Sequence, residues 1–110
     1  MNGATLQSLG NGRFKLSGRL DADSVVSVLK QSHQRFAESK AVEIDLAGVT
    51  ESDSSGLALL LEWLRLARIA ERSIHFQHLP AQLGALARIS EVEDLLAANG
   101  GVAAEPAAAI

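Results

Sequence analysis

The sequence contains no cysteine, which excludes disulfide bonds, thiol catalysis and metal sites built from thiolates. It also lacks a basic excess, because 10 Lys and Arg stand against 13 Asp and Glu and give a formal net charge of −3. Without a positive field to attract phosphate groups, neither a nucleic acid nor an anionic membrane surface is an expected partner. The longest apolar run, residues 57–66, is interrupted by Glu62 and Arg65 and falls far short of the roughly 20 residues that span a bilayer.

The first residues, Met1–Ala4, lack the charged and apolar segments of a signal peptide, which predicts a cytoplasmic location. A chain of 110 residues that is 47% hydrophobic can bury one sizeable core. We therefore expect a single domain over residues 1–98. The alanine-rich residues 99–110 are expected to form a flexible tail.

Apolar and polar residues alternate in three segments, at residues 13–17, 42–46 and 73–77, and each is followed by a helix-like stretch. An earlier run, Thr5–Leu9, is joined to the first of them by Gly10–Gly12, whose residues tolerate a positive φ and favour a tight hairpin. The pattern predicts an α/β fold with a small mixed β-sheet that contains one antiparallel hairpin.

Cap residues and apolar spacing predict four helices between and after these strands. Asp21 or Asp23 can cap the first helix, and Pro80 opens the third at its first turn. The segment Ser90–Glu93 has the form of a capping box and predicts a short fourth helix.

Side chains suited to metal or acid–base chemistry do not converge in the sequence. The candidates are His33, His75, His78, the pair Glu43 and Asp45, and the pair Glu51 and Asp53. His75 and His78 are three apart in a predicted strand and so point to opposite faces, while His33 has no acidic residue one turn away. The carboxylate pairs have no Lys, Arg or His within sequence reach. We expect no catalytic residue, no metal and no cofactor.

The segment Asp53–Gly56 joins a strand to a strongly apolar helix that is expected to run from Leu57 to about Ala70. Its hydroxyl groups lie where unsatisfied amides and the helix dipole favour an anion. Two interpretations remain open. Asp53 or Ser54 is an ordinary N-cap, or the serines form a regulatory site at which a phosphate would add nearly two negative charges.

The helix that follows has more apolar surface than one face of a sheet can bury. At about 100° per residue, its core-facing arc is joined by a second arc that contains Leu59, Trp63 and Leu66. The surplus packs either on a neighbouring helix or on another protein, and aromatic residues are favoured as interface anchors. These three residues are therefore candidates for binding a partner.

Three segments in this order resemble the STAS domain family, which is shared by anti-sigma-factor antagonists and the tails of sulfate transporters. They are Leu16–Asp21, Val42–Leu46 and Ser52–Leu57, the last leading into the leucine-rich helix. The resemblance covers about residues 6–98. It implies a small sheet with about four helices packed mainly on one face, no enzymatic activity, and a function exercised through protein contacts at the start of the second helix.

Within this family, Gly56–Leu61 and the single-domain length are most similar to MlaB-like proteins, the STAS subunits of ABC transporters that move phospholipid and maintain outer-membrane lipid asymmetry. This resemblance implies that the partner is the transporter's ATPase subunit (MlaF-like), in a complex with the membrane permease. It assigns partner binding to Asp53, Ser54, Ser55 and Gly56, with Ser54 at a position that such proteins fill with Thr. The protein would then lie at the inner membrane only through this complex.

An anti-sigma-factor antagonist is the alternative. In those proteins a kinase phosphorylates the second hydroxyl position, which falls on Ser55, whereas many MlaB-like sequences have Gly there. Ser55 is therefore a possible phosphorylation site.

Overall fold

The structure is a computed structural model that describes residues 3–98. Within these residues the chain forms four β-strands and four α-helices. In chain order they are β1 (Ala4–Gly10), β2 (Arg13–Leu20), α1 (Ala22–Phe36), β3 (Ala41–Ser52), α2 (Ser54–Ile69), β4 (Ser73–Gln77), α3 (Ala81–Ile89) and α4 (Glu93–Ala98). The expected tail, residues 99–110, lies outside the described residues.

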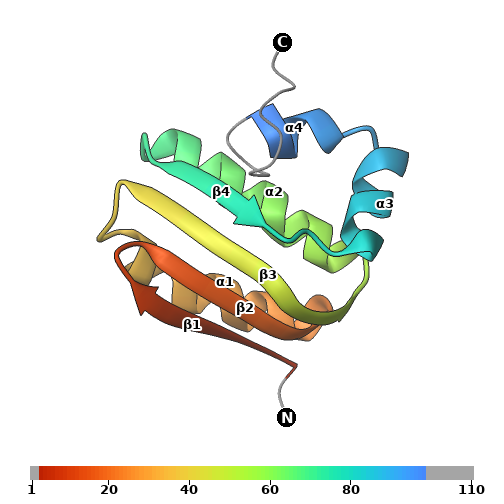
Figure 1. Cartoon of the computed structure of the whole chain (residues 1–110), viewed down its shortest axis with the longest axis horizontal. Coiled ribbons are helices and arrows are strands. Elements are labelled where there is room, and N and C mark those ends of the chain that lie inside the picture. The colour runs from red at the N-terminus through yellow and green to blue at the C-terminus, as the bar shows by residue number, and fades with distance from the viewer. Residues whose placement is uncertain (1–2, 99–110) are drawn as a thin grey trace.

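The four strands form one mixed sheet in the order β1-β2-β3-β4 (Figure 1). The pair β1 and β2 is antiparallel, whereas β2 with β3 and β3 with β4 are parallel. At the hairpin turn, Gly10, Asn11 and Gly12 have φ of 90°, 56° and 78°, which is the positive φ that a tight hairpin requires. The predicted mixed sheet with one hairpin is confirmed.

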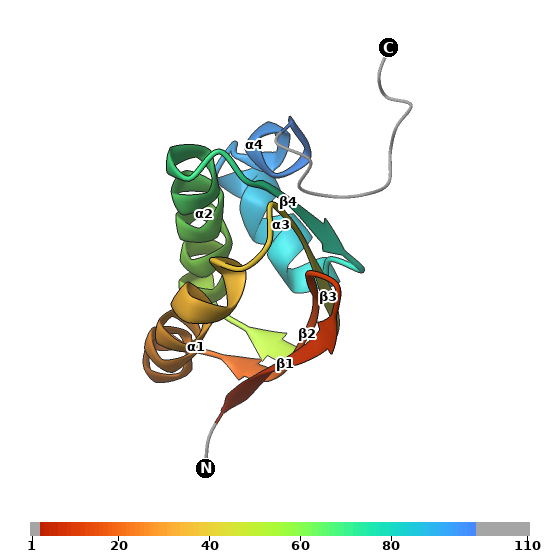
Figure 2. The same ribbon diagram turned by 90° about the vertical axis from the view of Figure 1, so that its left-hand side faces the viewer.

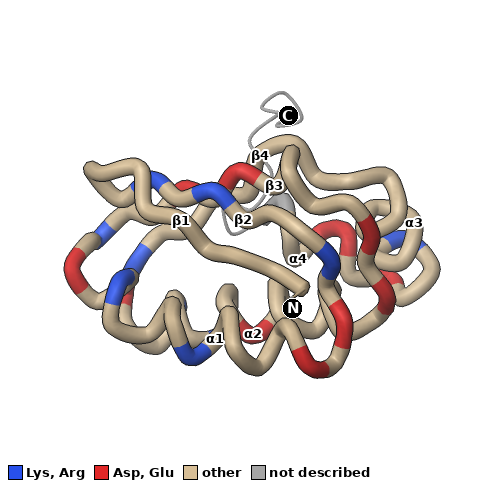
Figure 3. The backbone as a smooth tube through the Cα atoms, turned by 90° about the horizontal axis from the view of Figure 1, so that it is seen from below, with Lys and Arg blue, Asp and Glu red and all other residues tan. Residues whose placement is uncertain are grey.

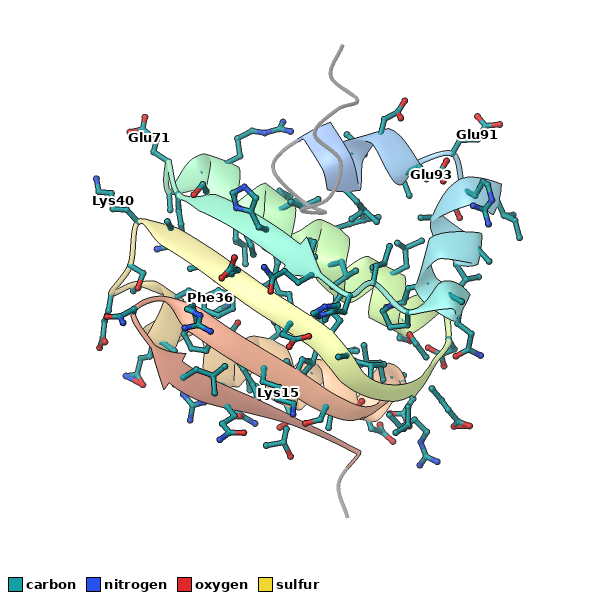
Figure 4. All side chains as sticks on the ribbon, viewed as in Figure 1. Lys15, Phe36, Lys40, Glu71, Glu91 and Glu93 are labelled. Atoms are coloured by element: carbon teal, nitrogen blue, oxygen red, sulfur yellow. The ribbon has the colours of Figure 1, made fainter. Side chains whose placement is uncertain are left out.

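The helices leave one face of the sheet open. Helices α1 and α2 cover the other face, and α3 and α4 pack against α2 beyond the β4 edge (Figures 1 and 2). Polar and charged side chains such as Lys15 of β2 stand on the open face (Figure 4). This arrangement confirms the α/β class and the expectation of helices mainly on one face.

The core contains all four aromatic residues of the chain in one continuous row. Ring centroids are 4.9 Å apart for Phe14 and Phe36, 5.4 Å for Phe36 and Trp63, and 6.3 Å for Trp63 and Phe76. The Trp63 Nε1–H group donates a hydrogen bond of 2.9 Å to Ser32 Oγ of α1, so the buried indole has its polar group satisfied. The row joins both helices to the sheet.

The prediction that Leu59 and Trp63 contact a partner is wrong, because the structure buries both side chains. They are 3% and 1% exposed. The reason is that α1 lies alongside α2 and covers the second apolar arc, which a helical wheel of α2 alone cannot show. Leu66 of the same arc is half-buried and lines a cleft between α1 and α2.

The predicted capping box at Ser90 is also wrong. Ser90 ends α3 instead, with its N–H donating to the Leu86 carbonyl, and α4 begins only at Glu93. Glu91 has a φ of 59°, and the Val92 N–H donates to the Ala87 carbonyl at 2.9 Å. This is the Schellman arrangement, which satisfies the last carbonyls of α3 and needs a left-handed residue at Glu91, where a capping box would place its first right-handed helical residue.

Candidate functional site

The parallel pairing of β2 and β3 brings the starts of α1 and α2 to the same end of the sheet. Leu20 and Ser52, the last residues of these strands, are Cα partners in the sheet. Each is followed by an aspartate that caps the next helix, Asp21 for α1 and Asp53 for α2. The Asp53 N–H donates to the Leu20 carbonyl at 3.2 Å, so the two caps are tied together through the backbone.

At the start of α2, Asp53 is the N-cap and the serines are not. Its Oδ1 accepts a hydrogen bond of 2.7 Å from the Ser55 N–H, which satisfies one of the free amides of the first turn. The helix begins at Ser54, three residues earlier than predicted. Ser54 is exposed and Ser55 is half-exposed, and neither hydroxyl has a hydrogen-bond partner among residues 3–98.

Gly56 lies beneath these serines and is buried, so the prediction that it contacts a partner directly is wrong. A Cβ at this position would collide with Ser52 Oγ and lie 3.2 Å from Leu20 Cβ. Ser52 is fixed in turn, because its N–H donates to Gln82 Oε1 at 3.0 Å and its hydroxyl donates to the Asp53 carbonyl at 3.0 Å. Gly56 therefore lets the first turn of α2 sit close against the ends of β2 and β3.

Carboxylates gather around these helix starts. A hollow of about 230 Å³ beside Asp53 is also lined by Asp21, Glu51 and one cation, Arg19. Arg19 is already engaged, with its Nε 3.3 Å from Asp21 Oδ2. The Ser24 backbone amide, the Ser24 hydroxyl and Arg19 together lower the pKa of Asp21. Figure 3 shows acidic positions along the side of the molecule to which these residues belong.

An exposed stripe of α2 continues from Ser54 through Ala58, Leu61 and Arg65. Ala58 and Arg65 are exposed and Leu61 is half-buried, and Arg65 is held by Glu62, with Nη2 2.7 Å from Oε2. The sequence analysis missed Ala58 and Leu61 as site residues. Their spacing of four and seven residues from Ser54 was the available signal, because such residues share one helix face.

Other candidate side chains meet on the open face of the sheet. The strand β4 ends at Gln77, so the prediction that His78 lies in a strand is wrong; its φ is 57°. Its Nδ1 is 2.9 Å from Asp45 Oδ1. The pKa of Asp45 is lowered chiefly by a hydrogen bond from the Ala47 amide and secondly by the contact with His78. Gln77 Nε2 donates to Glu43 Oε2 at 2.9 Å.

Neither this group nor any other in residues 3–98 brings together three His, Asp or Glu side chains that could hold a metal ion. Within the same residues, no helix is both long enough and apolar enough to cross a membrane.

The family model described as "Mlab, STAS domain" matches residues 4–97. The chain belongs to the STAS domain family. Its fold is similar to that of the anti-sigma factor antagonist SpoIIAA in its unphosphorylated form, with a TM-score of 0.65, 14% identity and coverage of 82% of each chain. At this identity the likeness concerns the fold. A search of proteins with curated functions found no match. STAS domains generally act by binding other proteins, so the exposed start of α2 is best examined as a binding surface.

Proposed function

We propose that this STAS domain is a non-enzymatic, MlaB-like subunit that binds the ATPase of a phospholipid ABC transporter and stabilises or regulates it. Its role would be to support the transport that maintains outer-membrane lipid asymmetry. The observation that carries this proposal is the first turn of α2, where Ser54 and Ser55 present hydroxyls without partners in the described structure. The match to the MlaB-type family model supports the choice of partner.

The stripe from Ser54 has the composition of a small protein interface. Ser54 offers a hydroxyl at one end, Ala58 lets a partner backbone approach closely, and Leu61, one turn further along, supplies apolar surface. Arg65 ends the stripe and is paired with Glu62, so both charges are satisfied. A polar rim around a small apolar centre is the usual anatomy of a binding surface.

The charges around the serines favour this function over a phosphorylation switch. A phosphate on Ser54 or Ser55 adds about −1.5 to −2 charges near neutral pH. It would enter a region that already contains Asp21, Glu51 and Asp53 and whose cation, Arg19, is paired with Asp21. The like charges oppose such a modification, whereas an unmodified hydroxyl meets no such penalty.

Two observations favour the alternative, a phosphorylation-switched anti-sigma-factor antagonist. Ser55 is half-exposed with its hydroxyl unpartnered in residues 3–98, and the fold is similar to that of an antagonist. Under this function, Ser55→Asp would imitate the modified, inactive state and Ser55→Ala would stay permanently active. Under the transporter function, the sensitive position would be Ser54, and Ser55→Ala would keep the outer membrane resistant to detergent.

Purification of the tagged full chain from its native cells, with the membrane fraction solubilised, tests the proposal. We expect recovery of an ABC ATPase together with its membrane permease, identified by mass spectrometry. Recovery of a serine kinase and a sigma-factor regulator, with no ATPase, would contradict the proposal and support the alternative. Removal of the gene should lower detergent resistance under the transporter function.

A further inference from the structure

The outer edge of β1 carries backbone groups that no other strand pairs. The Gly3 carbonyl accepts a hydrogen bond of 2.6 Å from the Arg19 N–H, which places Gly3 among the residues that face β2. Because successive residues of an antiparallel strand face opposite sides, the backbone groups of Ala4, Leu6 and Ser8 face the free edge. Figure 3 views the molecule from this side, with β1 in front.

One side chain from another element reaches this edge. Arg35, in the last turn of α1, donates from Nη1 to the Leu6 carbonyl at 2.7 Å. A groove of about 710 Å³ runs beside the edge and is lined by residues of β1, by the hairpin turn, and by Phe14, Arg35 and Glu38. The guanidinium of Arg35 thus stands at the middle of the exposed edge.

Apart from a register irregularity between Ser8 and Gly10, next to the hairpin turn, β1 has no residue type that commonly protects an edge. β1 has the sequence ATLQSLG, without proline and without a charged residue, and its Leu9 is 46% exposed. Natural sheets usually guard such an edge with Lys, Pro or an inward-pointing charge, since a bare edge strand templates pairing with another chain. Here the charge comes from α1.

We propose that Arg35 keeps β1 from pairing with β1 of a second copy of this chain. A two-fold antiparallel pairing centred on Leu6 needs its carbonyl, which Arg35 occupies. The same symmetry would bring the two Arg35 guanidinium groups close together within the new interface, and like charges there oppose association. Without Arg35, the free edge would therefore pair with β1 of a second copy, and Arg35 prevents this pairing.

The test compares molar mass in solution, by light scattering during gel filtration, over a series of protein concentrations. The wild-type chain should run as a monomer of 11.6 kDa. Arg35→Met keeps most of the apolar stem but removes the donor and the charge, and it should give a twofold higher mass as concentration rises. Arg35→Lys retains a charge and a donor and should remain monomeric.

Two further variants separate edge pairing from general destabilisation. Arg72→Met removes a matched bond that does not involve β1, because Arg72 Nε donates to the Ser39 carbonyl at 2.9 Å. This variant should stay monomeric. Adding Ser8→Pro to Arg35→Met removes an outward N–H and should restore the monomer. The proposal is overturned if Arg35→Met stays monomeric, if Arg72→Met dimerises equally, if the double variant still dimerises, or if the wild type already pairs through this edge.

Discussion

The first turn of α2 and the turn around Trp63 lie on the same helix but have opposite environments. At the first turn, Ser54 is exposed and the hydroxyls are unpartnered in the described structure. Around Trp63, the side chain is 1% exposed and its N–H is bonded to Ser32 of α1. The difference arises because the sheet and α1 together cover α2 around Trp63, whereas they leave the stripe that begins at Ser54 open. One helix therefore holds the domain together and also presents its candidate binding surface.

The largest expected effect is a loss of stability when the buried side chain of Trp63 is removed. Trp63→Ala should reduce the free energy of unfolding by roughly 3–5 kcal/mol, because it empties a buried aromatic site and removes the indole bond to Ser32. Urea unfolding monitored by far-UV circular dichroism measures this change. A loss of less than 1 kcal/mol together with loss of partner binding would instead place Trp63 at the interface.

The exposed stripe should give the reverse result. Ala58→Arg puts a long charged side chain in the middle of the stripe and should weaken ATPase binding by about 2 kcal/mol or more, while stability changes by about 0.5 kcal/mol at most. Ile89→Arg is the matched control, since Ile89 is 78% exposed on α3. Isothermal titration calorimetry with the purified ATPase checks both variants, and equal affinities for the two would count against the stripe.

Gly56 is a buried residue of the exposed first turn, and its substitution should cause an intermediate loss of stability. Gly56→Ala forces its Cβ against Ser52 Oγ and Leu20, which should destabilise the fold by about 1–2 kcal/mol after the better helix propensity of alanine is included. Gly84→Ala in α3 is the control, because the nearest neighbour of its Cβ is Leu79 Cδ2 at an ordinary 3.8 Å.

The Gly84 variant should be more stable by about 0.5–1 kcal/mol. Thermal unfolding of both variants, together with the double variant Gly56→Ala and Ser52→Ala, locates the collision. The double variant should recover part of the loss, and no recovery would show that Ser52 is not the obstructing neighbour.

The smallest effect concerns pH at the neighbouring start of α1. The pKa of Asp21 is lowered from its ordinary value of 3.8, so the folded state binds a proton less readily than the unfolded chain. Its stabilisation is present above 3.8 and is lost as pH falls through the lower, folded-state pKa. Asp21→Asn should flatten the fall in unfolding free energy over this acidic range, and an NMR titration of the Asp21 carboxyl that gives a pKa above 3.8 would contradict the sign.

The sequence predicts those features of the fold whose signals are local. The hairpin at Gly10–Gly12, the alternation that makes each strand and the cap at Asp21 depend on neighbouring residues, and all three are confirmed. The capping box predicted at Ser90 is wrong because a short polar segment suits both the end of one helix in a Schellman motif and the start of the next in a capping box. The local signals did not distinguish them.

The features that the sequence could not predict depend on packing between distant segments. Nothing in α2 itself shows that α1 lies alongside it and buries Trp63 through a bond to a residue 31 positions earlier. The contact of His78 with Asp45 spans 33 positions in the same way. For the candidate site, the sequence located the serines after Asp53, while the exposure of Ala58 and Leu61 required the helix to be placed on the sheet.

The most direct test of the central claim, that the start of α2 binds the ATPase, is the affinity of Ser54→Asp for the purified ATPase, measured by calorimetry beside Ser73→Asp. Both serines are exposed, and Ser73 begins β4, outside the proposed stripe. The helix start favours the added carboxylate while the nearby carboxylates oppose it, so the unfolding free energy of Ser54→Asp should stay within about 1 kcal/mol of the wild type. We predict that Ser54→Asp loses about 2–5 kcal/mol of binding free energy, because the carboxylate is desolvated without a partner, and that Ser73→Asp binds as the wild type does. Wild-type affinity in Ser54→Asp would contradict the account and leave the start of α2 as a helix cap only.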